Sequence, residues 1–303
     1  MPAADRLLVP LLALLAACSS SATQEPQPAV EETFVPHQPP QPEPIGKLLA
    51  DLDLKMRAWT NLTLTARSEE ERRRARELGS MLQLETRKRL DELVLELETG
   101  PPRNRQRAAA ALGFTHDPRV LGPLLAALED PDLDVVHNAL LGLALLSLAE
   151  TPTETIATLM SEHPDPATRS NAAYALRTVV EAGADPQPVV PAARMALLDS
   201  EPGVRLQAAL VVGLAADGES VQRLADLLHD EEPLVQLAAT EALVLIGQRS
   251  GPHKGAAARA LVDAWLDAER LFKARLRESM VTLAGKDLGN DDERWVEWSR
   301  NLP

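Results

Sequence analysis

The sequence predicts an all-α solenoid of repeated helix pairs, preceded by a helical N-terminal segment and a disordered tether. A sequence template recurs at near-constant spacing between residues 98 and 285. Hydrophobic residues make up 45% of the chain but aromatic residues only 3%, so the interior is expected to consist of Ala, Leu and Val on helices. Because one helix pair cannot bury both of its faces, repeated pairs must stack.

The first residues have the pattern of an export signal. Arg6 is the only basic residue before a short apolar run, Leu7–Ala17, which ends at the only cysteine, Cys18. The run is too short to span a bilayer, so residues 1–17 are predicted to be a signal peptide. Leu15-Ala16-Ala17-Cys18 resembles the lipobox of bacterial lipoproteins, which implies cleavage before Cys18 and lipid, such as palmitate, on that residue. An ordinary secretory peptide that carries a cysteine is the alternative.

The predicted lipid anchor and the net charge limit the expected cellular location and the expected binding partners. Ser19, not Asp, follows the cysteine, and by the sorting rule of bacterial lipoproteins this favours the outer membrane, facing the periplasm or the exterior. An acylated Cys18 leaves no thiol for a disulfide, a nucleophile or a metal site. The formal charge of −14 gives no favourable counterion release on nucleic acid, so DNA and RNA are not expected partners.

Residues 18–46 are the predicted tether. Seven prolines lie in this segment with Gln and Glu between them, so it cannot bury enough apolar surface to fold. We interpret it as a spacer between the membrane and the body of the protein. A recognition motif for a groove-binding partner is the alternative.

Residues 47–100 have helical periodicity and are predicted to begin the body. Ser68 and Glu71 have the spacing of a capping box. Gly79 is a predicted helix end. Glu69 and Glu70 precede Arg73 and Arg74 in the favourable i,i+4 order, which is typical of a solvated helix face.

Residues 101–285 carry the repeats, with the template D-x4-V-R-x2-A-A-x-A-L-G. Its anchor positions 104, 135, 168, 204 and 235 are separated by 31, 33, 36 and 31 residues, and a looser sixth copy begins at Leu276. The alanines allow close helix approach, and the glycine suits a left-handed helix end. The pattern resembles the short HEAT-like repeats of bacterial proteins, including relatives of phycobilisome lyases. That resemblance implies a solenoid of about five to six repeats and no single function, since it serves lyases, DNA-repair enzymes and adaptors alike.

Two features of the repeats and their tail have open alternatives. The template arginine recurs as Arg105, Arg169 and Arg205, either as a structural ladder bonded to the neighbouring turn or as an anion-binding row. The tail, residues 286–303, contains an acidic loop, Asp287–Asp292, followed by Trp295 and Trp298. We interpret it as a cap in which Trp295 packs against the helix of Met280 and Leu283. Calcium binding in the loop is the alternative, although its spacing lacks the EF-hand series.

No residue pattern in the chain indicates an enzyme. The six histidines are scattered, and none forms a tight ligand pair. Nucleophile elbows, P-loops and dinucleotide-binding glycine motifs are missing from the sequence. The sequence therefore predicts no catalytic residue, no metal site and no cofactor.

The predicted function is a membrane-anchored, non-catalytic scaffold or adaptor of the bacterial envelope. The second helix of each pair, counted from the template helix, is expected to line the concave face. Its outward side chains carry both signs of charge without an aromatic platform, which favours a protein or peptide partner: Arg119, Glu129, Glu162, Arg194, Arg223, Asp226, Arg259 and Asp263.

Two rival functions belong to other classes. A lyase- or isomerase-like protein acting on a cofactor-bearing partner would require two buried carboxylates on the concave face. A DNA-repair glycosylase would require a basic groove with aromatic side chains, which the charge of −14 disfavours.

Overall fold

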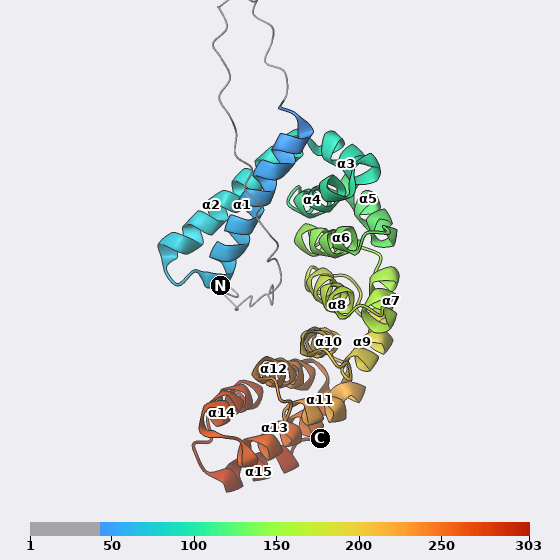
Figure 1. The fold of residues 1–303 in the computed structure, drawn as a ribbon. Coiled ribbons are helices and arrows are strands. Elements are labelled where there is room, and N and C mark those ends of the chain that lie inside the picture. The colour runs from blue at the N-terminus through green and yellow to red at the C-terminus, as the bar shows by residue number, and fades with distance from the viewer. Residues whose placement is uncertain (1–42) are drawn as a thin grey trace, which may run out of the picture.

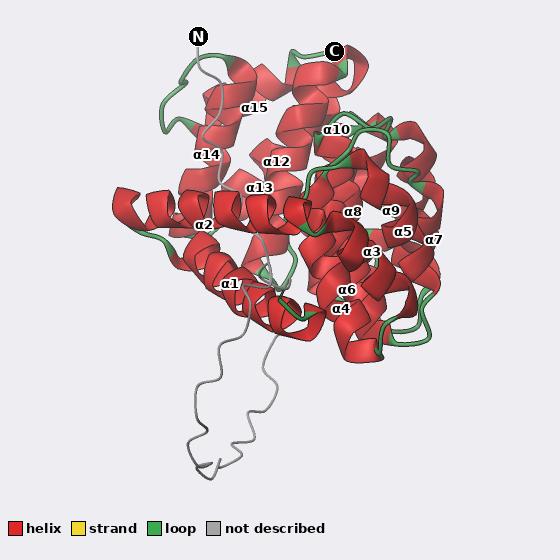
Figure 2. Ribbon diagram, turned by 90° about the horizontal axis from the view of Figure 1, so that it is seen from above, coloured by secondary structure: helices red, strands yellow, loops and turns green. Residues whose placement is uncertain are grey.

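The computed structural model describes residues 43–303, and all regular structure within that range is helical (Figures 1 and 2). Cys18 and nearly all of the predicted tether lie outside the described residues. None of the described helices is both long enough and apolar enough to cross a membrane. The first two, α1 (Ile45–Thr65) and α2 (Glu69–Lys88), form an antiparallel hairpin that extends beyond the rest of the body (Figure 2).

Six helix pairs follow the hairpin, which confirms the predicted solenoid. The first helices of the pairs are α3 (Leu90–Thr99), α5 (Leu121–Ala126), α7 (Glu154–Glu162), α9 (Val190–Ala196), α11 (Val221–Leu227) and α13 (Lys254–Asp267). The second helices, which carry the sequence template, are α4 (Pro102–Gly113), α6 (Leu133–Leu146), α8 (Pro166–Glu181), α10 (Pro202–Leu214), α12 (Pro233–Arg249) and α14 (Arg270–Ala284). A final helix, α15 (Asp292–Arg300), ends the chain.

The pairs stack into an arc with two rows of helices. Figure 1 shows α4, α6, α8, α10, α12 and α14 along the inner, concave side, and α3, α5, α7, α9 and α11 along the outer side. We call these sets the inner row and the outer row. The template helix is thus the second of its pair, and it lies on the concave side.

Small residues explain why the arc curves toward the template helices. A Cβ atom on Gly113 would lie 2.6 Å from the carbonyl oxygen of Gly142, and one on Gly142 would lie 2.5 Å from that of Ala109. In the same way, a Cβ on Gly213 would lie 2.7 Å from the Cα of Ala242. Close backbone approach shortens the spacing on the inner row, where successive helices lie closer together than successive helices of the outer row do. The row with the shorter spacing becomes the concave one.

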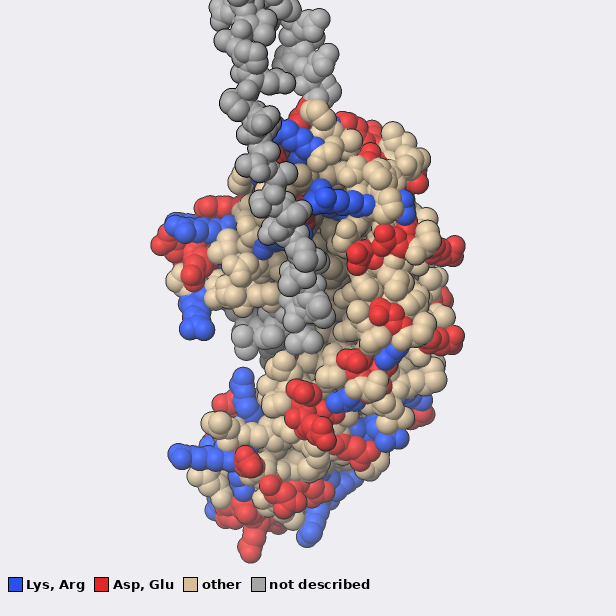
Figure 3. Space-filling model, viewed as in Figure 1, with Lys and Arg blue, Asp and Glu red and all other residues tan. Residues whose placement is uncertain are grey.

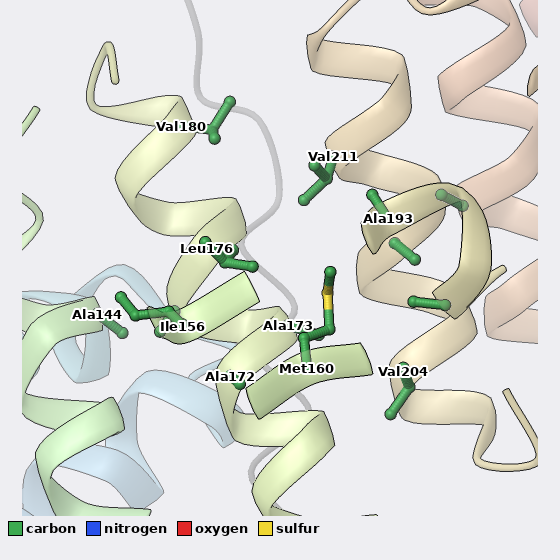
Figure 4. Close-up of a cluster of buried hydrophobic side chains, with 14 of the residues drawn as sticks. Ala144, Ile156, Met160, Ala172, Ala173, Leu176, Val180, Ala193, Val204 and Val211 are labelled. Atoms are coloured by element: carbon green, nitrogen blue, oxygen red, sulfur yellow. The ribbon is translucent and has the colours of Figure 1, made fainter. Parts of the chain in front are cut away.

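The core between the rows is aliphatic, as the composition predicted. Figure 4 shows Ile156 and Met160 of α7, Leu176 of α8 and Ala193 of α9 gathered between the helices. Each of these four side chains is fully buried. Burial at roughly 25 cal/mol per Å² of apolar area stabilises the stack mainly through contacts between neighbouring pairs.

The hairpin differs from its prediction at one helix end. The capping box at Ser68 is present, with the Glu71 amide donating to Ser68 Oγ at 3.2 Å. Gly79, however, lies inside α2, so the predicted helix end there is wrong. Gly79 lies where α2 crosses α1, and an added Cβ would lie 3.1 Å from Trp59 Nε1. The glycine therefore permits a close helix crossing.

Candidate functional site

An arginine ladder joins the turns of successive helix pairs, as the structural interpretation predicted. Arg105 donates to both carboxylate oxygens of Asp130, at 2.8 and 2.9 Å, and to the Gly100 carbonyl at 3.0 Å. Arg169 donates in the same way to Asp199, and Arg205 to Asp230. Both carboxylate oxygens of each aspartate accept from an arginine, so the row is occupied by internal bonds.

Each aspartate of the ladder also orders its own turn. Asp230 Oδ1 accepts from the backbone amide of Glu232 at 2.9 Å, and Asp199 and Asp130 accept from the equivalent amides. The hydrogen bonds from Arg105 hold the pKa of Asp130 below its usual range. Burial raises the pKa of Asp230, but the bonds from Arg205 and the Glu232 amide outweigh burial and leave it lowered. The carboxylates are therefore held in their charged form by the fold.

One rung of the ladder uses a different pair of residues. Val136 stands at the template arginine in α6, so no guanidinium is available there. His137, the next residue, lies 3.1 Å from Asp165 and 2.9 Å from Thr168 Oγ1 in the following turn. His137 thus makes the connection between turns that an arginine at position 136 would make.

The middle of the inner row carries a group of partly exposed apolar side chains. In α6 and α10 two partly exposed leucines lie four residues apart, whereas Glu241 of α12 is exposed at the repeat position of Tyr174. The set in the middle of the arc is Leu141, Leu145, Tyr174, Leu210, Leu214 and Leu245. Tyr174 occupies the repeat position of Leu141 and Leu210, 33 and 36 residues away, and it is the only tyrosine of the chain.

A polar cluster interrupts this apolar group between α8 and α10. Arg177, only 5% exposed, donates from Nε to Gln207 Oε1 at 2.7 Å and from a terminal nitrogen to Glu181 at 2.5 Å. Its guanidinium lies over the Tyr174 ring, 5.1 Å from the ring centre. Burial raises the pKa of Tyr174, so the phenol stays protonated at neutral pH. We call these four residues the Tyr174 cluster. Aromatic and arginine side chains held in fixed positions are typical centres of protein interfaces.

The predicted concave residues lie elsewhere, and this part of the prediction is wrong. Arg119 is in the turn before α5, Glu129 ends the short turn after it, and the others lie on the first helices of their pairs: Glu162 on α7, Arg194 on α9, Arg223 and Asp226 on α11, and Arg259 and Asp263 on α13. Figure 1 places α5, α7, α9 and α11 on the convex side. The repeat pattern alone does not say whether the template helix or the other helix of the pair lines the concave side. The close packing of the template helices places them on that side.

Three of these residues nevertheless come together. Arg194, Arg223 and Asp226 line a shallow hollow of about 320 Å³ between α9 and α11 on the outer row. Arg194 donates to both oxygens of Asp217, at 2.8 and 2.5 Å, and also pairs with Glu219. These bonds raise the pKa of Arg194. The ion pair of Arg194 and Glu219, which joins successive repeats, is therefore part of the wall of the hollow.

The remaining predicted residues form no group with this hollow. Arg119 pairs with Asp117, and Arg259 lies 3.4 Å from the Ser299 carbonyl, where it helps to hold α15 on α13. Glu162 and Asp263 are exposed. Cys18, the predicted lipidation site, lies outside the described residues.

The C-terminal tail forms a cap. Trp295 is fully buried, and its Nε1 donates to the Gly289 carbonyl at 2.9 Å. Trp298 packs edge-on against it, with ring centres 5.5 Å apart. The backbone of α15 lies chiefly against α13. The Trp295 side chain belongs to the same buried apolar cluster as Met280 and Leu283 of α14. In the acidic loop, Asp287 accepts from Arg277 at 2.6 Å and from the Gly289 amide at 2.8 Å.

The repeats identify the family of the chain. The family model for HEAT repeats matches residues 90–177 and 190–280. The chain belongs to the HEAT-repeat family. The matched region begins at the first residue of α3, so the HEAT array includes the pair α3 and α4. Comparison with curated protein sequences gives no match.

Solved structures similar to this HEAT protein come from several classes. A designed armadillo repeat protein in complex with the peptide (KR)4 is 15% identical, with 67% of this chain and 100% of that chain covered and a TM-score of 0.45. The complex of CpcE and CpcF of phycocyanin lyase from Nostoc sp. PCC7120 is 20% identical, with 91% and 100% covered and a TM-score of 0.42. Human deoxyhypusine hydroxylase is 20% identical, with 80% and 100% covered and a TM-score of 0.37.

Sequence reasoning missed the Tyr174 cluster. Tyr174, Arg177 and Gln207 come from two helices, and only stacking brings them together. A signal was nonetheless present, because Tyr174 is the only tyrosine and occupies a position that is leucine in neighbouring repeats.

Proposed function

We propose that this HEAT protein is a non-catalytic interaction scaffold of the bacterial envelope, anchored through lipid on Cys18, with its inner row as the binding surface. The observation that carries the proposal is the Tyr174 cluster, a prearranged aromatic and arginine pair on the concave side, where leucines of the neighbouring inner helices are partly exposed. A rigid surface of this kind binds a partner without first ordering its own side chains.

The buried carboxylates are bonded to arginines of the fold, which supports a scaffold function over that of a lyase or isomerase. Asp199, Asp217 and Asp230 are among the least exposed carboxylates of the described residues. Each accepts hydrogen bonds from an arginine of the preceding helix pair. A general acid and base must instead face a substrate. The proposal therefore assigns these groups to structure.

The proposed location in the bacterial envelope rests on the sequence. The Leu15–Cys18 tetrad follows an apolar run too short to span a bilayer, and prolines then separate it from the described body. Lipid on Cys18 would hold the solenoid near the membrane surface. Stable anchoring requires more than one acyl chain, and a lipoprotein-type cysteine carries lipid on both its thiol and its amino group.

Site-specific photocrosslinking tests the binding surface. The full-length protein carries a photoreactive phenylalanine analogue at position 174 and is irradiated in the cells that make it. A discrete protein adduct is expected from position 174. The matched control places the same analogue at Glu154, an exposed residue of α7 on the outer row. The inner-row proposal fails if position 174 gives no adduct, or if both positions give the same adducts.

A further inference from the structure

The arginine ladder is missing one rung, between α12 and α14. Gln236 stands in α12 where the template has arginine, and its amide turns back to the Asp230 carbonyl at 2.7 Å. The template aspartate of the next turn is replaced as well. Leu271 stands five residues before the anchor Leu276, the spacing that separates Asp230 from Val235. Both members of the ion pair are thus absent at the same place.

The helix that follows the missing rung also starts earlier. α14 begins at Arg270, six residues before its anchor Leu276, whereas α12 begins at Pro233, two residues before its anchor Val235. The turn with an acidic residue and proline that joins the two helices of other pairs is therefore replaced by an extra turn of helix. This extra turn carries Leu271 into solvent, with 87% of its surface exposed.

A groove of about 650 Å³ lies at the missing rung, and it is larger than the hollow between α9 and α11. Leu228, Leu237, Leu271 and Phe272 form its apolar part, and Gln236 lines it as well. An ion pair fills the equivalent place at the preceding rung, where Arg205 bonds Asp230. Because neither Gln236 nor Leu271 is charged, the place of the ion pair is an opening with an apolar part, and Leu271 lies at its border. A nearly fully exposed leucine at the mouth of an apolar groove marks an interaction surface.

Acidic side chains lie on part of the border of the apolar groove, which His229 and Arg275 also line. Asp267 and Glu269 line it, and Glu231 and Glu232 precede Pro233 of its wall. None of these four forms an ion pair with another described residue. Arg275, which also lines the groove, pairs with Glu278 at 2.9 Å. Figure 3 shows acidic side chains along the arc with lysines and arginines among them, and the chain as a whole has a net charge of −14. A second copy of this acidic chain would be repelled by such a border.

We propose that the groove at the missing rung docks a partner segment in which an apolar side chain is flanked by lysine or arginine. The apolar residue inserts beside Leu271 and Phe272, and the basic residues meet Asp267 and Glu269. Apolar burial supplies affinity, while the charges select basic segments and accelerate their encounter. The site lies between the α11–α12 turn and the α13–α14 turn, and it is separate from the Tyr174 cluster.

Selection from a displayed library of random peptides on the full-length protein tests this proposal. Peptides with Leu, Ile, Met or Phe next to Lys or Arg are expected to be enriched. Leu271→Asp should weaken their binding about tenfold or more, because it places a charge at the apolar contact. Leu271 is exposed, so this change leaves the fold intact. Leu54→Asp is the matched control, since Leu54 of α1 is 66% exposed and far along the chain.

A second variant rebuilds the rung. Gln236→Arg combined with Leu271→Asp restores the arginine and the aspartate, and should abolish peptide binding without lowering the melting temperature. Tyr174→Ala should leave this binding unchanged, which separates the groove from the proposed inner-row function. The proposal is overturned if enriched peptides are acidic or uncharged, if none depends on Leu271, or if the wild type forms a dimer that Leu271→Asp dissociates.

Discussion

Arg205 reaches from one helix pair into the turn of the next and donates to both carboxylate oxygens of Asp230, at 2.7 and 2.8 Å. The same guanidinium donates to the Asp199 carbonyl at 2.8 Å in its own turn. One side chain thus joins two consecutive turns. Because Asp199 is itself the acceptor for Arg169, the bonds continue along the edge of the solenoid.

Asp230→Ala should lower the free energy of unfolding by about 2–3 kcal/mol. The change removes the acceptor of Arg205 and of the Glu232 amide, and charged hydrogen bonds of this kind contribute about that much. Chemical denaturation of the full-length protein measures the effect. Asp226→Ala is the control, because Asp226 is 54% exposed and its weak pair with Arg223 contributes less than about 1 kcal/mol. Equal effects of the two changes would refute a stabilising role for the ladder.

Acid should destabilise the protein through the ladder carboxylates. The pKa values of Asp130, Asp199 and Asp230 are lowered in the folded state. Their stabilisation is therefore complete above the unfolded pKa of about 4 and is lost as the pH falls through the lower folded values. The free energy of unfolding, measured from pH 7 to pH 2, should fall mainly below about pH 4. Arg105→Gln should flatten this decline, whereas Arg300→Gln, at an exposed position, should not.

Gly142→Ala should destabilise the body by about 1–3 kcal/mol, because a Cβ there would lie 2.5 Å from the Ala109 carbonyl oxygen. Gly122→Ala provides a matched control. Gly122 lies in α5 with no atom within 4 Å of an added Cβ, so alanine should be neutral or stabilising there. Thermal unfolding of both variants measures the difference. A neutral Gly142→Ala would contradict the close packing that curves the arc.

Trp295→Ala should lower stability by about 3–5 kcal/mol, the usual range for a fully buried tryptophan. It also removes the hydrogen bond to the Gly289 carbonyl. Thermal unfolding with and without calcium separates the cap from a ligand site. A wild-type melting temperature that rises with calcium would favour the calcium alternative for the Asp287–Asp292 loop.

Cys18→Ser should release the protein from the membrane fraction or stall its processing, since it removes the predicted acylation site. Fractionation and electrophoretic mobility of the full-length protein measure this. An unchanged membrane fraction with unchanged mobility would exclude the lipid anchor. Ser19→Ala, at the neighbouring residue, serves as the control for the processing step.

The local chemistry of the repeats was predictable from the sequence. The template arginines and aspartates recur at the repeat spacing, which left a structural ladder and an anion-binding row as alternatives for Arg105, Arg169 and Arg205. The structure shows the ladder. The burial of Trp295 followed from the need to cover the last repeat. The helix end at Gly79 was mispredicted because glycine allows a turn and a close crossing equally well.

The sequence by itself determined the helical class, the repeat length and the positions of the recurring arginines and aspartates, because these depend on short-range periodicity. Only the tertiary structure decided which row of helices is concave, because curvature depends on the difference in helix spacing between the two rows. For the same reason, only the structure brought Tyr174 over Arg177 and placed Leu271 beside the groove at the missing rung. Sites built between repeats depend on stacking distances that no single repeat specifies.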